Sequence, residues 1–223
     1  MGRLFAISDI HGCFDAFYHL ITREIRLSKN DKLVLLGDYV DRGNQSKEVI
    51  DFIMDLMDTG FDIVPLTGNH EAMLLDSWKN YNMLPLWLLN DGTTTLHSFG
   101  IQEIGEMEKK YLDFFQSLKY YEETGSFLFV HAGFNDQAPD PFSDKHGMIW
   151  ESNPSYKNPL LANKIIVHGH RPKNVEFITR LLNENSKVIP IDTGCVYKEN
   201  GFGILSALDV GNMKLISIEN RWK

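Results

Sequence analysis

Three apolar runs of strand length, each followed by a cluster of polar side chains, constrain the fold of this chain more than any other feature. The runs are Leu4–Ile7, Leu33–Leu36 and Ile63–Leu66, and a glycine accompanies each polar cluster. Short apolar runs bounded by turn residues are typical of buried strands. In open α/β sheets the carboxyl ends of such strands surround the ligand site. We therefore expect the polar clusters to meet at one edge of a sheet.

The residue types in these clusters are those that bind divalent metals. The candidate ligands at strand ends are Asp9, His11, Asp38, Asn69 and His70, followed by His131 after Phe127–Val130 and by His168 and His170 after Ile165–Val167. Carboxylate and amide oxygens suit Mg, Ca and Mn, whereas imidazole suits Zn, Fe, Cu and Ni. A mixed oxygen and nitrogen set without thiolate favours Mn, Fe or Zn. The pattern predicts a site for two divalent metal ions.

Five short motifs follow one another along the chain. They are D-x-H-G at 9–12, G-D-x-x-D-R-G at 37–43, G-N-H-E at 68–71, H-A-G at 131–133 and G-H at 169–170. In this order the chain resembles the calcineurin-like metallophosphoesterases, and D-R-G with N-H-E resembles their phosphoprotein phosphatase branch, especially small bacterial and phage serine/threonine protein phosphatases. Two further stretches fit that group, W-L-L-N-D-G-T-T-T from Trp87 and I-D-T-G-C from Ile191.

The resemblance implies a ligand set for two metals that share one carboxylate. The implied ligands are Asp38 as the bridge, Asp9 and His11 for the first metal, and Asn69, His131 and His170 for the second. We expect manganese, with iron or zinc as alternatives. The residues alone leave open which of His168 and His170 faces the metal; we assign the ligand role to His170 and a core or supporting role to His168. Pro172 stands where broader relatives often carry another histidine, which favours the phosphatase branch.

The resemblance also implies hydrolysis by direct attack of a hydroxide held by both metals. His70 is our candidate general acid, and Asp41 would hold its imidazolium. An alkoxide from serine or threonine is a basic leaving group, so proton donation to it should matter. Arg42 offers the bidentate fork that suits phosphate oxygens, and Asn69 would also steer the phosphate.

One position departs from the bacterial phosphatase pattern. Those proteins usually carry a second phosphate-binding arginine shortly after a tryptophan, but Trp150 is followed here by Glu151 and the next arginine is Arg171. We predict that either Arg171 takes this role or Arg42 holds the phosphate alone.

Several polar or reactive residues near the motifs have a simpler structural interpretation. We expect Glu71 to cap the helix that follows it and Asp192 to be structural at its own strand end. Cys13 and Cys195 form neither a disulfide framework nor a C-x-x-C pair, and we expect both to be small buried residues.

The spacing of apolar residues predicts helices in the first half of the chain and strands in the second. Helices are expected over 14–27, 46–59 and from about 68 to 78, and strands over 127–130, 164–167, 175–179, 187–192, 203–209 and 213–219, the last two joined by a hairpin turn. Two stacked mixed sheets flanked by helices are therefore expected. This agrees with the αββα sandwich, an α/β fold, that the resemblance implies.

A stretch without ligand-type residues, from about residue 80 to 118, looks helical and interrupts the series of ligand-bearing strands. Because it carries Trp87, Asn90, Tyr111 and Phe114, we assign substrate contact to it. The alternative is that these aromatic side chains pack a helical cap, and for any single aromatic residue packing is the better explanation.

Length and composition indicate one domain over residues 1–223, with the helical stretch as an insertion. No apolar run approaches the roughly 18 residues of a membrane span, and the first strand-like run begins at Leu4, which leaves no room for a signal peptide. We expect a cytoplasmic protein without a membrane partner. The net charge of −8 argues against a nucleic-acid surface, although bound metals would reverse the field inside the site.

Three functions remain open. The first, which the presence of Asp41 favours, is dephosphorylation of phosphoserine or phosphothreonine in proteins or peptides. The second keeps the chemistry but takes a small nucleotide, as bis(5'-nucleosyl)-tetraphosphatases do; members of that related family tend to depart from the D-R-G aspartate. The third is a catalytically silent metal-binding or docking protein, which would lack the acid or a ligand, and none is missing here.

Overall fold

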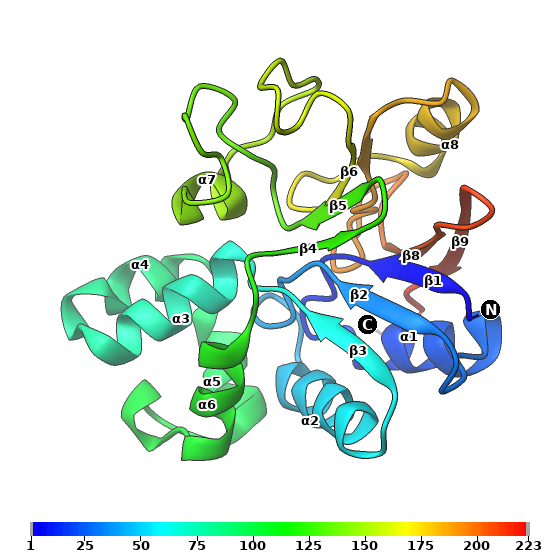
Figure 1. Ribbon diagram of the computed structural model, residues 1–223. Helices are drawn as coiled ribbons and strands as arrows, with labels where there is room; N and C mark the ends of the chain where they lie inside the picture. The colour runs from blue at the N-terminus through cyan, green and yellow to red at the C-terminus, as the bar shows by residue number, and fades with distance from the viewer. Residues whose placement is uncertain (1, 222–223) are drawn as a thin grey trace.

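The computed structural model describes residues 2–221 and contains two mixed β-sheets (Figure 1). In the first sheet β3 (Asp62–Pro65), β2 (Lys32–Leu35) and β1 (Leu4–Ile7) are parallel, and β8 (Ile204–Asp209) and β9 (Lys214–Glu219) continue the sheet in antiparallel pairs. The second sheet has the order β4 (Tyr121–Thr124), β5 (Phe127–Val130), β6 (Ile165–His168), β7 (Val188–Pro190), with β5 to β7 parallel and β4 antiparallel to β5. The expected sandwich of two mixed sheets flanked by helices is confirmed.

The alternation of side chains along the strands divides the core into layers. Phe5 and Ile7 of β1 point to the helices on the outer face of the first sheet, whereas Ala6 points to the core between the sheets. In β5, Phe129 shares that central core and Leu128 lies on the opposite, outer face of the second sheet. Both faces of these strands are buried, which explains why their sequences are continuous apolar runs.

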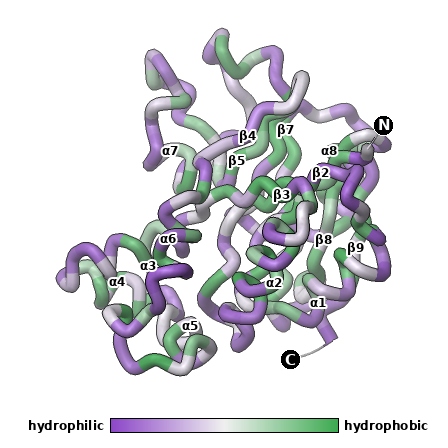
Figure 2. Tube along the Cα trace, turned by 60° about the horizontal axis from the view of Figure 1, so that its bottom comes forward, coloured by the Kyte–Doolittle hydropathy of each residue, from purple (hydrophilic) through white to green (hydrophobic). Residues whose placement is uncertain are grey.

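Helices surround the two sheets and extend to one side (Figure 1). They are α1 (Phe14–His19) with its π-helical continuation η1 (Leu20–Ile25), α2 (Ser46–Asp58), α3 (Asn69–Lys79), η2 (Tyr81–Met83), α4 (Leu84–Leu89), α5 (Gly92–Phe99), η3 (Ile104–Glu106), α6 (Lys109–Ser117), α7 (Lys145–Trp150) and α8 (Val175–Asn183). Figure 2 shows hydrophobic residues concentrated in the strands and mixed with hydrophilic ones along the helices. No helix within residues 2–221 has the length and apolar character needed to cross a membrane.

The strand expected at Val175–Thr179 is wrong, because this segment is the start of helix α8. The side chain of Asn174 accepts a backbone N–H of the first turn at 2.8 Å and so caps the helix. Ile178 and Leu182, one turn apart, are buried against the central core. The β-branched residues of the segment suggested a strand. The Asn174 cap and the burial of two residues one helical turn apart instead favour a helix. Helix α7 and the edge strand β4 were not predicted from the sequence.

The stretch from 80 to 118 is helical as expected, but the three aromatic side chains assigned to substrate contact do not face an open surface. Trp87, Tyr111 and Phe114 are buried, and the Tyr111 hydroxyl donates to Asp51 at 2.8 Å. The half-exposed Asn90 side chain donates to the carbonyl of Leu86 in its own helix at 2.9 Å. The packing interpretation therefore holds for the three aromatic residues.

Candidate metal and catalytic centre

Two groups of metal-type side chains lie together at the carboxyl ends of the parallel strands. His11, Asp38 and His70 form one group, and Asp38, His131 and His170 the other; the ligand atoms within each group are within 4.8 Å of one another. Asp38 belongs to both. The sequence prediction that separate strand ends deliver their side chains to one place agrees with this arrangement.

Asp38 lies between the two groups. Its Oδ2 is 3.5 Å from His11 Nε2 and 3.5 Å from His131 Nε2. Burial alone would raise the pKa of Asp38, but the surrounding histidines, His131 first, hold it below its usual range. An ionised carboxylate equidistant from two imidazoles has the position that a shared metal ligand requires.

The imidazoles of His11 and His131 are oriented by backbone carbonyls. His11 Nδ1 is 2.9 Å from the carbonyl oxygen of Val40, and His131 Nδ1 is 2.9 Å from that of Leu36. Because a carbonyl can only accept, each Nδ1 carries the proton and donates it. The Nε2 lone pairs of both rings therefore face the centre, which is how metal-binding histidines are commonly held.

In the second group, three donor atoms approach one another closely. Asn69 Oδ1 is 3.0 Å from His131 Nε2 and 3.0 Å from His170 Nδ1, and these two nitrogens are 3.2 Å apart. Two imidazole nitrogens, an amide oxygen and the nearby Asp38 carboxylate make a mixed set that suits Mn, Fe or Zn. The donor set therefore fits a divalent metal, although the identity of the metal stays a prediction.

Asp9 is also at the centre but belongs to neither group. Its carboxylate accepts the backbone N–H of His170, at 3.1 Å to Oδ1 and 3.0 Å to Oδ2, and the hydroxyl of Ser8. Burial, followed by the charges of Asp192 and Asp38, raises the pKa of Asp9 well above its usual value. The structure thus brings Asp9 beside the ligand groups, and its role as a metal ligand stays a prediction.

Many residues of the centre have left-handed backbone conformations. These residues, with φ in parentheses, are Asp9 (51°), His11 (45°), Asp38 (55°), Asp41 (67°), Arg42 (68°) and His170 (71°). Such conformations cost about 1–3 kcal/mol each for residues other than glycine and gather at functional sites. They bend the chain sharply after the strands, so that side chains from separate strand ends point to one place.

Glu71 stabilises the strained loop that carries Asp38. Its Oε2 accepts the backbone N–H groups of Asp38 at 2.8 Å and Gly68 at 2.9 Å, and its Oε1 accepts that of Tyr39 at 2.8 Å. Burial and the charge of Asp38 raise the pKa of Glu71 to about 7, although the backbone donors oppose this shift. Glu71 therefore ties the start of α3 to the loop after β2, which agrees with the structural role expected for it.

His70 forms a buried pair with Asp41 and directs its other nitrogen to the centre. His70 Nδ1 is 2.7 Å from Asp41 Oδ2, whereas His70 Nε2 has no hydrogen-bond partner within residues 2–221 and lies 4.0 Å from Asp38 Oδ2. Burial lowers the pKa of His70, but the carboxylates of Asp38 and Asp41 outweigh it, and the net shift is upward. The protonated ring is favoured, with an N–H available on the side of the ligand groups.

Asp41 is itself held by two residues whose role was not foreseen. Trp87 Nε1 donates to its two oxygens at 2.9 and 3.1 Å, and Thr95 Oγ1 donates to Oδ1 at 2.6 Å. Gly92 allows this arrangement, because a Cβ at that position would lie 2.6 Å from the Trp87 ring. The W-L-L-N-D-G-T-T-T stretch, which the sequence analysis noticed without explaining, thus positions Asp41 and through it His70.

Arg42 lies at the border of the centre, and Arg171 lies elsewhere. Arg42 Nη1 donates to His11 Nε2 at 2.8 Å, and its guanidinium carbon is 5.6 Å from the centroid of the Tyr197 ring. Arg171 is exposed and lines a separate pocket of about 310 Å³ together with His168. Phosphate binding by Arg42 and Arg171 stays a prediction, and the two arginines do not line the same pocket.

The remaining residues singled out in the sequence have structural contacts. His168 is buried outside both ligand groups, and burial lowers its pKa to about 4. Asp192 accepts the backbone N–H of Gly194 at 2.8 Å, and burial raises its pKa to about 7. Cys13 and Cys195 are both buried, as expected.

The family model of the calcineurin-like phosphoesterases matches residues 2–216, and the chain belongs to this family. The family resemblance drawn from the five motifs is thereby confirmed.

Two kinds of bis(5'-nucleosyl)-tetraphosphatase are similar to this chain in sequence. The asymmetrical bis(5'-nucleosyl)-tetraphosphatase PrpE of Anoxybacillus flavithermus is 25% identical over 237 residues, which cover 95% of this chain and 92% of that protein. The symmetrical bis(5'-nucleosyl)-tetraphosphatase of Pseudomonas fluorescens is 30% identical over 133 residues, which cover 60% of this chain and 43% of that protein, less than half its length.

Solved structures with the same fold include a "putative diadenosine tetraphosphatase", with a TM-score of 0.70 at 20% identity over 97% of this chain and 93% of that one. A serine/threonine phosphatase from Saccharomyces cerevisiae, described as similar to human phosphatase PP5, has a TM-score of 0.67 at 17% identity over 98% of this chain and 80% of its own. At these identities the two structures establish the fold alone.

Proposed function

We propose that this protein is a metal-dependent hydrolase of dinucleoside tetraphosphates. The assignment as a hydrolase is supported by the position of Asp38, which lies between two groups of candidate metal ligands. The Nε2 atom of His70, which has no hydrogen-bond partner among the described residues, lies beside it. The substrate is supported by the PrpE relative, which is named for this activity and aligns over nearly its whole length.

The residues proposed to hold two divalent cations are Asp9, His11, Asp38, Asn69, His131 and His170. We expect manganese. When bound, the cations would polarise the phosphoryl oxygens and lower the pKa of the attacking water. Arg42, at the border of the centre, would hold the scissile phosphate through its guanidinium fork.

His70 would donate the Nε2 proton to the leaving oxygen. The Nδ1 contact with Asp41 keeps the ring in one orientation and stabilises its charged form. The charge on Asp41 is in turn kept in place by the donors from Trp87 and Thr95. General acid catalysis of this kind typically contributes about 10²–10⁴ in rate.

A nucleotide substrate reverses the preference of the sequence analysis, which favoured phosphoproteins. That preference rested on the presence of Asp41. The separate assignment of substrate contact to the helical stretch fails for Trp87, Tyr111 and Phe114, which are buried in the core. For the same reason neither Trp87 nor Tyr111 can stack on a nucleotide base.

Phosphoserine or phosphothreonine hydrolysis is the second candidate, and the His70–Asp41 pair is the observation that favours it. A serine or threonine alkoxide is more basic than a leaving phosphate and needs a proton donor more. Asp41, with its three side-chain donors, keeps such a donor in place.

The test compares kcat/KM for diadenosine tetraphosphate and a phosphothreonine peptide with manganese supplied. We expect a preference for the dinucleotide of about a hundredfold, equal to about 2.7 kcal/mol in transition-state stabilisation. His70→Asn should lower kcat/KM for the preferred substrate, whereas His97→Asn, which changes an exposed histidine on α5, should leave kcat/KM unchanged. A preference for the peptide would overturn the nucleotide assignment. Turnover of neither substrate would instead support the silent metal-binding protein.

A further inference from the structure

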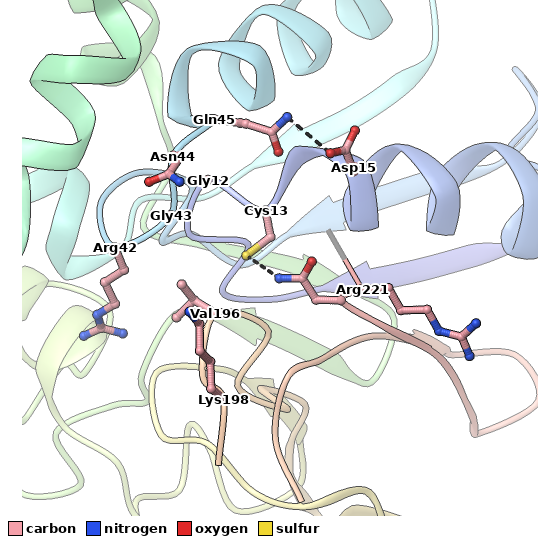
Figure 3. A pocket seen from close by; sticks show the side chains of 11 residues that line it. Gly12, Cys13, Asp15, Arg42, Gly43, Asn44, Gln45, Val196, Lys198 and Arg221 are labelled. Carbon is pink, nitrogen blue, oxygen red and sulfur yellow. Dashed lines mark hydrogen bonds between the residues drawn. The ribbon is translucent and has the colours of Figure 1, made fainter. Parts of the chain in front are cut away.

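A pocket of about 620 Å³ lies beside the metal and catalytic centre (Figure 3). It is formed by the loops after β1 and β2, by the segment that precedes β8, and by Asn220 and Arg221 after β9. Its lining includes Arg42, Gln45, Lys198 and Arg221, with Asp15 at the start of α1. None of the roles assigned above uses this space, apart from Arg42 at its edge.

The pocket is cationic in a chain with a net charge of −8. Arg42 and Arg221 lie at its two ends, and Lys198 lies along the side between them (Figure 3). Asp15 is the one acidic residue of its described lining, and Gln45 Nε2 donates to it at 3.3 Å. Arg221 pairs with the exposed Glu219 at 3.1 Å, a surface contact of little strength. The charges of Arg42 and Lys198 therefore favour an anionic ligand.

The pocket adjoins the centre at Arg42. The same guanidinium that lines the pocket donates to His11 Nε2 at 2.8 Å. Its other neighbour is Tyr197, which precedes Lys198. The Tyr197 N–H donates to the carbonyl of Gly194 at 3.0 Å, and the Gly194 N–H donates to Asp192 at 2.8 Å, so this loop is anchored beside the centre.

We propose that this pocket binds the phosphate chain next to the scissile phosphate, together with the nucleoside that the chain carries. The inference rests on the proposed function, because a scissile phosphate must first occupy the centre. A single phosphate would leave most of the pocket volume empty, whereas pockets of 300–1,000 Å³ are typical for ligands of nucleotide size. Contacts to such remote parts of a substrate raise kcat/KM.

The test uses Lys198→Met with diadenosine tetraphosphate and p-nitrophenyl phosphate, which has no second phosphate. We expect kcat/KM to fall about tenfold or more for the dinucleotide and by less than about threefold for p-nitrophenyl phosphate, because remote binding is lost. Lys214→Met is the matched control. Lys214 is exposed on β9 and lies opposite Asp209 of β8, which is next to the start of β1, whereas the pocket lies beyond the end of β1. An equal loss on both substrates, or none on the dinucleotide, would overturn the inference.

A second measurement separates this inference from the proposed function. If the wild-type protein shows no preference for the dinucleotide over p-nitrophenyl phosphate, the proposed function fails. The pocket is then tested by inhibition of p-nitrophenyl phosphate hydrolysis with tripolyphosphate and with ATP, manganese being in excess. A weaker inhibition of Lys198→Met by both anions supports the phosphate-chain subsite, and an unchanged inhibition constant overturns it. Equal inhibition by ATP and tripolyphosphate would overturn the nucleoside part.

Discussion

Replacing Asp41 with Asn tests whether His70 acts as a proton donor, because it removes a charge without changing the size of the side chain. The carboxylate contacts His70 Nδ1 at 2.7 Å and accepts from Trp87 at 2.9 Å and Thr95 at 2.6 Å. An asparagine has one accepting oxygen, so its amide nitrogen must face at least one of these donors.

The structure sets the size of both expected effects. Losing one hydrogen bond to a buried charged group costs about 1.5–3 kcal/mol, and we expect the free energy of unfolding to fall by about that amount. His70 also loses the carboxylate that stabilises its charged form. We therefore expect kcat to fall about 10²–10³-fold where the leaving group needs a proton, within the usual contribution of a general acid.

The assay measures kcat for a series of aryl phosphates whose leaving groups differ in pKa. For Asp41→Asn the loss should be at least about a hundredfold with phenyl phosphate and less than about tenfold with p-nitrophenyl phosphate, whose leaving group departs without a proton. Asp91→Asn is the matched control, since Asp91 is exposed and its side chain does not cap α5. The same loss for every leaving group would refute the role of His70 as general acid.

Further predictions concern the supports of the centre and of the fold. Gly92→Ala should lower the free energy of unfolding by about 1–3 kcal/mol, as overpacking does, because the new Cβ meets the Trp87 ring at 2.6 Å; chemical denaturation measures this, and an unchanged stability contradicts it. The Arg3 hydrogen bonds, although opposed by burial, hold the pKa of Asp31 below its usual range. This stabilisation is present above about pH 4 and is lost as the pH falls through the folded-state pKa. Asp31→Asn should therefore lower Tm more at pH 7 than at pH 2, and equal changes at both would contradict the ion pair. His131→Ala removes a proposed metal ligand and should reduce the amount of manganese bound, as measured by equilibrium dialysis. Unchanged manganese binding would contradict this ligand role.

The strands and their ligand-type ends could be predicted because the buried sheets leave a strong local pattern. Ala6, Val34 and Val64 face the second sheet, whereas their neighbours face helices, so each run is apolar throughout. The helix α8 could not be recognised in the same way. Its segment has the β-branched residues of a strand, and only the Asn174 cap and the burial of residues on one helical face distinguish it.

The residues that form the metal and catalytic centre could be predicted from the sequence, but the contacts between them could not. Asp38, His131 and His170 lie together, because the carboxyl end of β2 in the first sheet meets the carboxyl ends of β5 and β6 in the second. The contacts of Asp9 depend on the approach of the His170 backbone from another sheet, which no local pattern reveals. The link from Trp87 to Asp41 joins positions 46 residues apart, so the motif could be seen but its purpose could not.

Metal stoichiometry tests whether two metal ions share Asp38. Protein loaded with manganese and freed of excess metal would be measured by inductively coupled plasma mass spectrometry, for the wild type, Asp38→Asn and the control Asp91→Asn. A two-metal centre predicts about two manganese ions per chain for the wild type and the control, and fewer than about one for Asp38→Asn, because a shared ligand serves both ions. One ion or none in the wild type, or full occupancy in Asp38→Asn, would contradict it.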